Sequence, residues 1–145
     1  MHKAMVQSLP DYTYTQLLTS DGHSTVADEP TDSGGNGLGP SPYEFLLWAL
    51  GACTSMTLQM YAERKGYPLE EVAIQMEHDR VHAEDTGKDG DASIGRLDVI
   101  RRKIVIRGDL TDEQRADLLR VAGKCPVAKT IESGPVIEDE IEVVA

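Results

Sequence analysis

The chain has 145 residues, 40% hydrophobic and 27% charged, and this length and composition predict one folded domain spanning residues 1–145. Its 14 basic and 25 acidic residues give a net charge of −11, which repels phosphate backbones and argues against a nucleic-acid partner. No stretch approaches the ~20 apolar residues of a membrane helix. The first residues lack the apolar core of a secretion signal, and there are too few cysteines for a disulfide-stapled scaffold. We therefore expect a cytoplasmic protein with reduced thiols and no membrane partner.

The first third of the chain is predicted to be β structure. Alternation from Tyr12 to Leu18 indicates one strand, and a second is expected from His23 to about Asp28. Between them, Asp21-Gly22 suits the positive φ angles of a tight hairpin turn. The Gly-, Pro- and Ser-rich stretch 30–42 is then expected to form a loop.

A long helix is predicted to follow this loop. Ser41 is a suitable N-cap, Pro42 suits the first helical position, and Glu44 completes a capping box with Ser41. Residues 45–60 are apolar on nearly every side, and a helix of that kind must be buried all round. Because a small chain has difficulty burying such a helix beneath one sheet, we expect a homodimer with this helix near the interface.

The second half of the chain is predicted to alternate between strands and helices. A second capping box, Thr111 with Gln114, marks the start of one helix, and Cys125-Pro126 marks the start of a shorter one. The order of elements predicts an α+β domain with segregated layers. The expected elements are a strand 72–80, a loop 84–93, a strand 94–107, a helix from 111 to about 122, a helix 127–132 and a strand 136–144.

The two cysteines are the candidate chemical groups. Cys53 lies in the apolar helix, where a plain structural cysteine is one interpretation. Cys125 would cap the short helix, so that free backbone N–H groups and the helix dipole favour its thiolate, although a simple cap is equally open. Sequence spacing cannot decide whether the two sulfurs meet. If they do, they form a redox pair that passes through a sulfenic acid to a disulfide.

Two segments resemble the signature motifs of the OsmC/Ohr family, the osmotically inducible and organic-hydroperoxide-resistance proteins. They are residues 39–54, GPSPYEFLLWALGACT, and residues 123–127, GKCPV, followed by Thr130-Ile131. Gly22-His23, Asp28-Glu29-Pro30 and Gly34-Gly35 are similar to a YhfA-like branch. The resemblance implies an OsmC-like α+β fold, with β-sheet wrapped around a long buried central helix in an intertwined homodimer whose active sites lie at the subunit interface.

The resemblance also implies a function. Family members with activity are thiol-dependent peroxidases that reduce hydrophobic organic hydroperoxides, so Cys53 would attack the peroxide and Cys125 would resolve the intermediate. An external dithiol reductant of lipoyl type would restore the pair, with no bound cofactor and no metal. The family activates its first thiol with an Arg and a Glu. Here no Arg precedes Arg64, and Tyr43 stands at the usual carboxylate position, which leaves Glu44 as a tentative catalytic residue or a helix cap.

Two further functions remain open from the sequence. One is a non-catalytic OsmC-like dimer that binds an apolar small molecule at the subunit interface, which the missing Arg and displaced Glu motivate. The other is thiol-based hydrolysis by a cysteine with His23.

Overall fold

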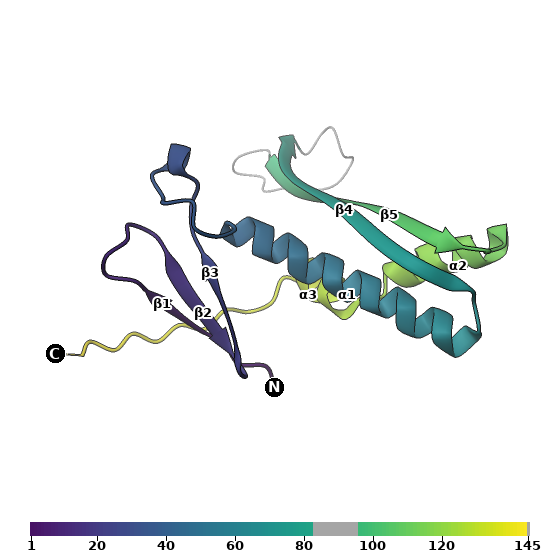
Figure 1. Ribbon diagram of the computed structural model, residues 1–145, viewed down its shortest axis with the longest axis horizontal. Coiled ribbons are helices and arrows are strands. Elements are labelled where there is room, and N and C mark those ends of the chain that lie inside the picture. The colour runs from purple at the N-terminus through teal and green to yellow at the C-terminus, as the bar shows by residue number, and fades with distance from the viewer. Residues whose placement is uncertain (83–95, 145) are drawn as a thin grey trace. The chain divides into compact units, whose positions relative to one another are not determined.

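The computed structural model describes residues 1–82 and 96–144, so the predicted loop 84–93 lies outside the described residues. The chain divides into two units, Met1–Trp48 and Ala49–Ala145. One helix, α1 (Pro42–Lys65), contributes residues to both units, and Figure 1 shows it as a single continuous rod. No helix in the described ranges has the length and apolar character needed to span a bilayer.

The first unit contains a three-stranded antiparallel meander in the order β1-β2-β3. The strands are β1 (Met5–Ser8), β2 (Gln16–Ser20) and β3 (His23–Ala27). Asp21 and Gly22 have φ angles of 43° and 80°, which confirms the predicted hairpin turn. The strand expected from Tyr12 begins only at Gln16. Strand β1 was not predicted because all four of its residues are exposed and show no burial pattern.

The loop after β3 is organised by one buried carboxylate, Asp28, which is 2% exposed. It accepts hydrogen bonds from the Thr15 hydroxyl at 2.8 Å and from the backbone N–H groups of Glu29, Asn36 and Leu38 at 2.8, 3.4 and 3.2 Å. Burial raises the pKa of this carboxyl, but the hydrogen bonds outweigh burial and bring the pKa below its ordinary value. The predicted loop is therefore an ordered segment.

Helix α1 begins with the predicted capping box. The Ser41 N–H donates to Glu44 Oε2 at 2.8 Å, and the Glu44 N–H donates to Ser41 Oγ at 3.4 Å. The expectation that the helix is buried on every side does not hold within one chain, because its buried residues form a single stripe. The stripe consists of Leu50, Gly51, Thr54, Leu58 and Ala62.

The second unit contains a long antiparallel hairpin of β4 (Leu69–His82) and β5 (Arg96–Gly108). Exposed and partly buried residues alternate along both strands, as expected for a sheet with one covered face. The helices lie on that covered side (Figure 1). Met76 pairs with Arg102 and Ile74 with Ile104 on this face.

Two shorter helices complete the second unit, α2 (Asp112–Ala122) and α3 (Pro126–Ser133). The predicted capping box of α2 is present, with the Gln114 N–H donating to Thr111 Oγ1 at 3.1 Å. Cys125 is the N-cap of α3 with Pro126 in the first turn, also as predicted. Together with the sheets, these helices confirm the α+β fold class. Leu58 and Leu118, which are 0% and 2% exposed, form the centre of the core between α1 and α2.

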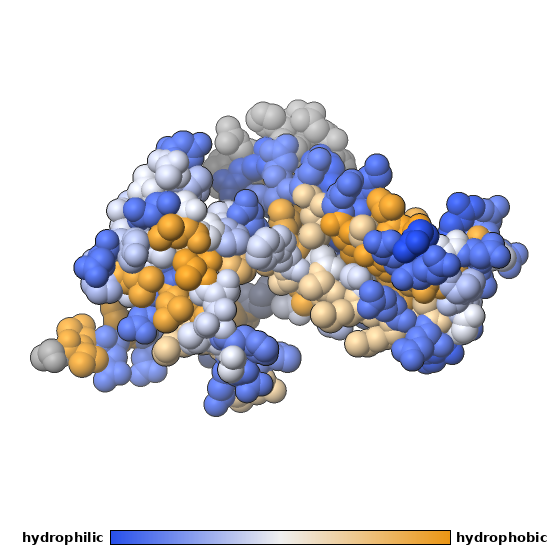
Figure 2. All heavy atoms as spheres, in the orientation of Figure 1, coloured by the Kyte–Doolittle hydropathy of each residue, from blue (hydrophilic) through white to orange (hydrophobic). Residues whose placement is uncertain are grey.

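The predicted C-terminal strand 136–144 is wrong. Residues 134–144 have no strand assignment and all of them are exposed. The segment has the apolar alternation of a strand, but none of the described strands pairs with it, and a strand without a neighbour leaves its backbone groups to water. The hydrophobic residues of this segment therefore remain exposed, and orange atoms lie at the lower left of Figure 2, where Figure 1 marks the C-terminus.

Candidate functional site

Cys53 and Cys125 lie in the same hydrophobic cluster of the second unit. The buried members are Leu50, Cys125 and Ala128, and Cys53 packs against them. The two thiols are close enough to shift each other's pKa in opposite directions. Both are free thiols. The sequence left open whether they meet, and the fold places them side by side by bringing the start of α3 against α1. The remaining apolar walls are Met76, Ile100, Val127 and Ile131.

Cys125 has the environment of a stabilised thiolate. Its side chain is 0% exposed, and burial alone raises the pKa of a thiol. The nearby donors outweigh that cost and lower the Cys125 pKa below its ordinary value; they are the Cys53 thiol, the Ala128 N–H, the Thr54 hydroxyl and the Val127 N–H. Cys125 is the N-cap of α3, as predicted, and its side chain makes no capping hydrogen bond. The N–H groups at the start of the helix act on the sulfur by their proximity.

Cys53 has the opposite character. Its side chain is only partly buried. Burial raises the pKa of its thiol, and the neighbouring Cys125 raises it further. The pKa values of the two thiols therefore differ, and the enclosed Cys125 loses its proton at lower pH than the more accessible Cys53.

A cation reaches this cluster from the sheet, which the sequence reasoning missed. Arg102 Nη1 on β5 donates to Thr54 Oγ1 at 2.9 Å and to the Ala122 carbonyl at 3.2 Å. An activating arginine was expected before the cysteine helix, where the sequence has none. The available signal was the alternation of β5, which puts Arg102 on the same face as Ile100 and Ile104.

The tentative catalytic Glu44 is a helix cap in this structure. It is exposed, belongs to the first unit, and makes its hydrogen bonds with Ser41. His23 is an exposed residue of β3 in the same unit. The cysteines belong to the second unit.

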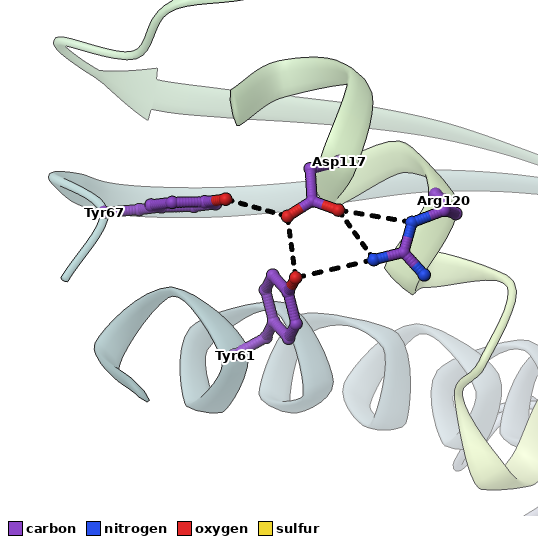
Figure 3. Close-up of polar contacts among 4 residues, drawn as sticks. All are labelled: Tyr61, Tyr67, Asp117 and Arg120. Carbon is purple, nitrogen blue, oxygen red and sulfur yellow. Dashed lines mark hydrogen bonds and ion pairs between the residues drawn. The ribbon is translucent and has the colours of Figure 1, made fainter. Parts of the chain in front are cut away.

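A second polar cluster lies further along α1 and was also missed (Figure 3). The carboxylate of Asp117 on α2 accepts hydrogen bonds from the hydroxyls of Tyr61 and Tyr67 at 2.7 and 2.8 Å. Arg120 Nη2 donates to it at 2.6 Å. The Tyr61, Arg120 and Tyr67 hydrogen bonds together hold the pKa of Asp117 well below its usual value. This cluster joins α1, the turn after it and α2.

The comparisons with known proteins identify one family. The model of the OsmC-like protein family matches residues 34–140, which include both cysteine segments. No curated protein sequence matches this chain.

Solved structures show the same fold at low sequence identity. An OsmC-like protein from Mycoplasma pneumoniae is 18% identical with a TM-score of 0.72, over 92% of this chain and 89% of that one. An organic hydroperoxide resistance protein from Legionella pneumophila is 16% identical with a TM-score of 0.65, over 90% and 88%. One from Elizabethkingia anophelis is 17% identical with a TM-score of 0.64, over 92% and 89%. With the family model covering most of the sequence, the chain belongs to the OsmC-like protein family.

Proposed function

We propose that this protein is a thiol-dependent peroxidase that reduces hydrophobic organic hydroperoxides with Cys53 and Cys125. The observation that carries the proposal is the pair of neighbouring free thiols in one apolar cluster, one side chain partly exposed and the other buried. The structural neighbours described as organic hydroperoxide resistance proteins support the same chemistry.

In the first step, Cys53 is the attacking residue because it is the more accessible sulfur. Cys125 lies beside it and has the lower pKa, so the Cys125 thiolate is the base that takes the proton of Cys53. The Cys53 sulfur then attacks the terminal peroxide oxygen, and the O–O bond breaks. The products are a sulfenic acid on Cys53 and an alkoxide that leaves as an alcohol after taking a proton from solvent.

In the second step, the Cys125 thiol condenses with the sulfenic acid. A disulfide forms between the two sulfurs, and the hydroxyl of the sulfenic acid leaves as water with the Cys125 proton. An external dithiol then reduces the disulfide by two thiol exchanges and is itself oxidised.

The walls of the cluster favour a substrate with an apolar organic group. Leu50, Met76 and Ile131 offer it only hydrocarbon and thioether surface. Hydrogen peroxide gains nothing from such walls, so organic hydroperoxides are expected to react faster.

We infer that the working unit is a homodimer. Met56 and Met60 are 55% and 67% exposed and lie one turn apart on α1, away from the buried stripe. A second copy of the chain would cover this apolar surface. A cytoplasmic location fits the proposal because thiols are kept reduced there. Light scattering of the purified protein tests the dimer, and Met56→Glu is expected to weaken it.

Stopped-flow oxidation of the reduced protein tests the peroxidase. One equivalent of cumene hydroperoxide is expected to remove both thiols and form an intramolecular disulfide, faster than hydrogen peroxide does. Cys125→Ser is expected to react once and more slowly, leaving a sulfenic acid that dimedone traps. Cys53→Ser is the decisive variant, since oxidation at the wild-type rate would overturn the assignment. Native mass spectrometry of the same sample would detect a retained apolar ligand.

A further inference from the structure

Arg102 is a positive charge on the covered face of the β4–β5 sheet. Its neighbours Arg101 and Lys103 are exposed on the opposite face, whereas Arg102 is partly buried. One nitrogen of its guanidinium bonds both Thr54 Oγ1 on α1 and the last carbonyl of α2, that of Ala122. These two contacts direct the charge toward the cysteine cluster rather than toward solvent.

Thr54 links this charge to the cysteine. Its side chain is 0% exposed, and its hydroxyl donates to the Leu50 carbonyl at 2.7 Å. Cys125 lies beside this group, because its backbone N–H donates at 3.4 Å to the Ala122 carbonyl that also accepts from Arg102. The Thr54 hydroxyl is one of the groups that lower the Cys125 pKa. A hydroxyl has one proton and two acceptor positions. Arg102 fills one acceptor position, so the proton can point to the carbonyl or to the sulfur, but not to both.

We propose that Arg102 is a positioning residue that stabilises the thiolate of Cys125 through the hydroxyl of Thr54. The hydrogen bond from the guanidinium polarises the O–H group, because linked hydrogen bonds strengthen one another. When Cys125 carries its proton, the hydroxyl donates to the Leu50 carbonyl. When the sulfur is negative, the hydroxyl turns to it and donates the polarised proton.

The other charged groups around Cys125 leave this role to Arg102. From α1, the titratable neighbour is Cys53. Further along the covered face of the sheet, Nε2 of His78 pairs with Asp98 at 3.0 Å, and Arg80 also contacts that carboxylate. Lys124 and Lys129, beside Cys125 and one turn into α3, are exposed. Within residues 1–82 and 96–144, Arg102 is the cation whose observed hydrogen bonds reach the cluster.

The value of this thiolate for turnover rests on the proposed peroxidase function, in which Cys125 accepts the proton of Cys53. The thiolate itself can be measured without any peroxide. Failure of the peroxidase proposal and failure of the Arg102 proposal are therefore separate results.

The test is a pH titration of the thiolate by its ultraviolet absorbance, in a Cys53→Ser background where Cys125 is the remaining thiol. Adding Arg102→Met is expected to raise the midpoint by about one pH unit, a tenfold loss of thiolate at a given pH below the midpoint. Thr54→Val is expected to raise it similarly, while Thr54→Ser, which keeps the hydroxyl, restores the parent midpoint. Combining Arg102→Met with Thr54→Val should add little to Thr54→Val alone, because both break the same path.

Arg101→Met is the matched control, because it removes the same charge from the exposed face of the same strand. An unchanged midpoint in that variant supports the proposal, and an equal rise would show that only net charge matters. The proposal is overturned if Arg102→Met keeps the parent midpoint while its circular dichroism remains native. If Arg102→Met does not fold, the Thr54→Val and Thr54→Ser pair decides, and equal midpoints in those two variants overturn it.

Discussion

Helix α1 carries two clusters along its buried stripe, and they differ in what they enclose. Around Leu58, apolar side chains of α1, α2 and the sheet fill the core, and the charged Asp117 group lies at its margin. Around Leu50, the apolar side chains instead surround the two thiols and the Thr54 hydroxyl, which accepts a hydrogen bond from Arg102. We refer to them as the Leu58 cluster and the thiol cluster.

The difference shows how hydrogen bonds can serve stability or reactivity. At the Leu58 cluster, Asp117 carries full charge and its donors come from groups that hold their protons at neutral pH, so the arrangement is fixed. At the thiol cluster, the donors surround a sulfur that can gain or lose a proton and form a new bond. Substitutions at the first cluster should change the free energy of unfolding, and those at the second should change the pKa and the reactivity of the thiols.

Leu58→Ala is expected to have the largest effect on stability. The side chain is 0% exposed in the centre of its cluster, and removing a buried leucine typically costs about 2–5 kcal/mol. Urea unfolding followed by circular dichroism measures this loss. Leu119→Ala, on the neighbouring helix and 69% exposed, is the control and should change stability by less than about 0.5 kcal/mol. Equal losses of stability in the two variants would contradict the assignment of the Leu58 cluster as a centre of stability.

Asp117→Asn is expected to destabilise the protein less than Leu58→Ala, and in a pH-dependent way. The folded-state pKa of Asp117 lies below its ordinary 3.8. Its contribution is therefore present above that value and is lost as the pH falls through the folded-state pKa. The difference in urea midpoint between wild type and variant should shrink on acidification below about pH 4. A constant difference for Asp117→Asn across this pH range would contradict the assignment.

Tyr67→Phe is expected to have a smaller effect than Asp117→Asn. It removes one donor from the carboxylate, while the Tyr61 and Arg120 hydrogen bonds remain. Thermal unfolding of Tyr67→Phe, Tyr61→Phe and the double variant would show whether the two hydroxyls act as one network. Strictly additive changes in melting temperature would mean that they act independently.

Cys53→Ala is expected to change stability least, within about 1 kcal/mol, because the side chain is small and partly exposed. It should instead raise the pKa of Cys125, because the neighbouring Cys53 side chain is one of the groups that lower that pKa. Cys53→Ser retains a donor and is the comparison variant. Identical thiolate titrations of the two variants would show that Cys53 does not influence the Cys125 charge.

Local signals predicted most of the elements. Each confirmed local feature depends on residues within four positions of one another. These features are the capping boxes at Ser41 and Thr111, the Asp21-Gly22 turn and the cap at Cys125. The prediction of a strand at 136–144 was wrong because an alternating pattern forms a strand only when a neighbouring strand pairs with its backbone. The all-round burial of α1 failed within one chain because burial depends on what packs against the helix.

The sequence by itself determined where the helices begin, where the hairpin turns, and that Cys125 sits at a helix N-terminus, because capping and turn geometry act between near neighbours. Only the tertiary structure decided that Cys53 and Cys125 touch, that Arg102 reaches Thr54, and that Asp117 gathers Tyr61 and Tyr67. These contacts join residues that are far apart in the chain. They form only when the packing of helices on a sheet fixes which faces meet.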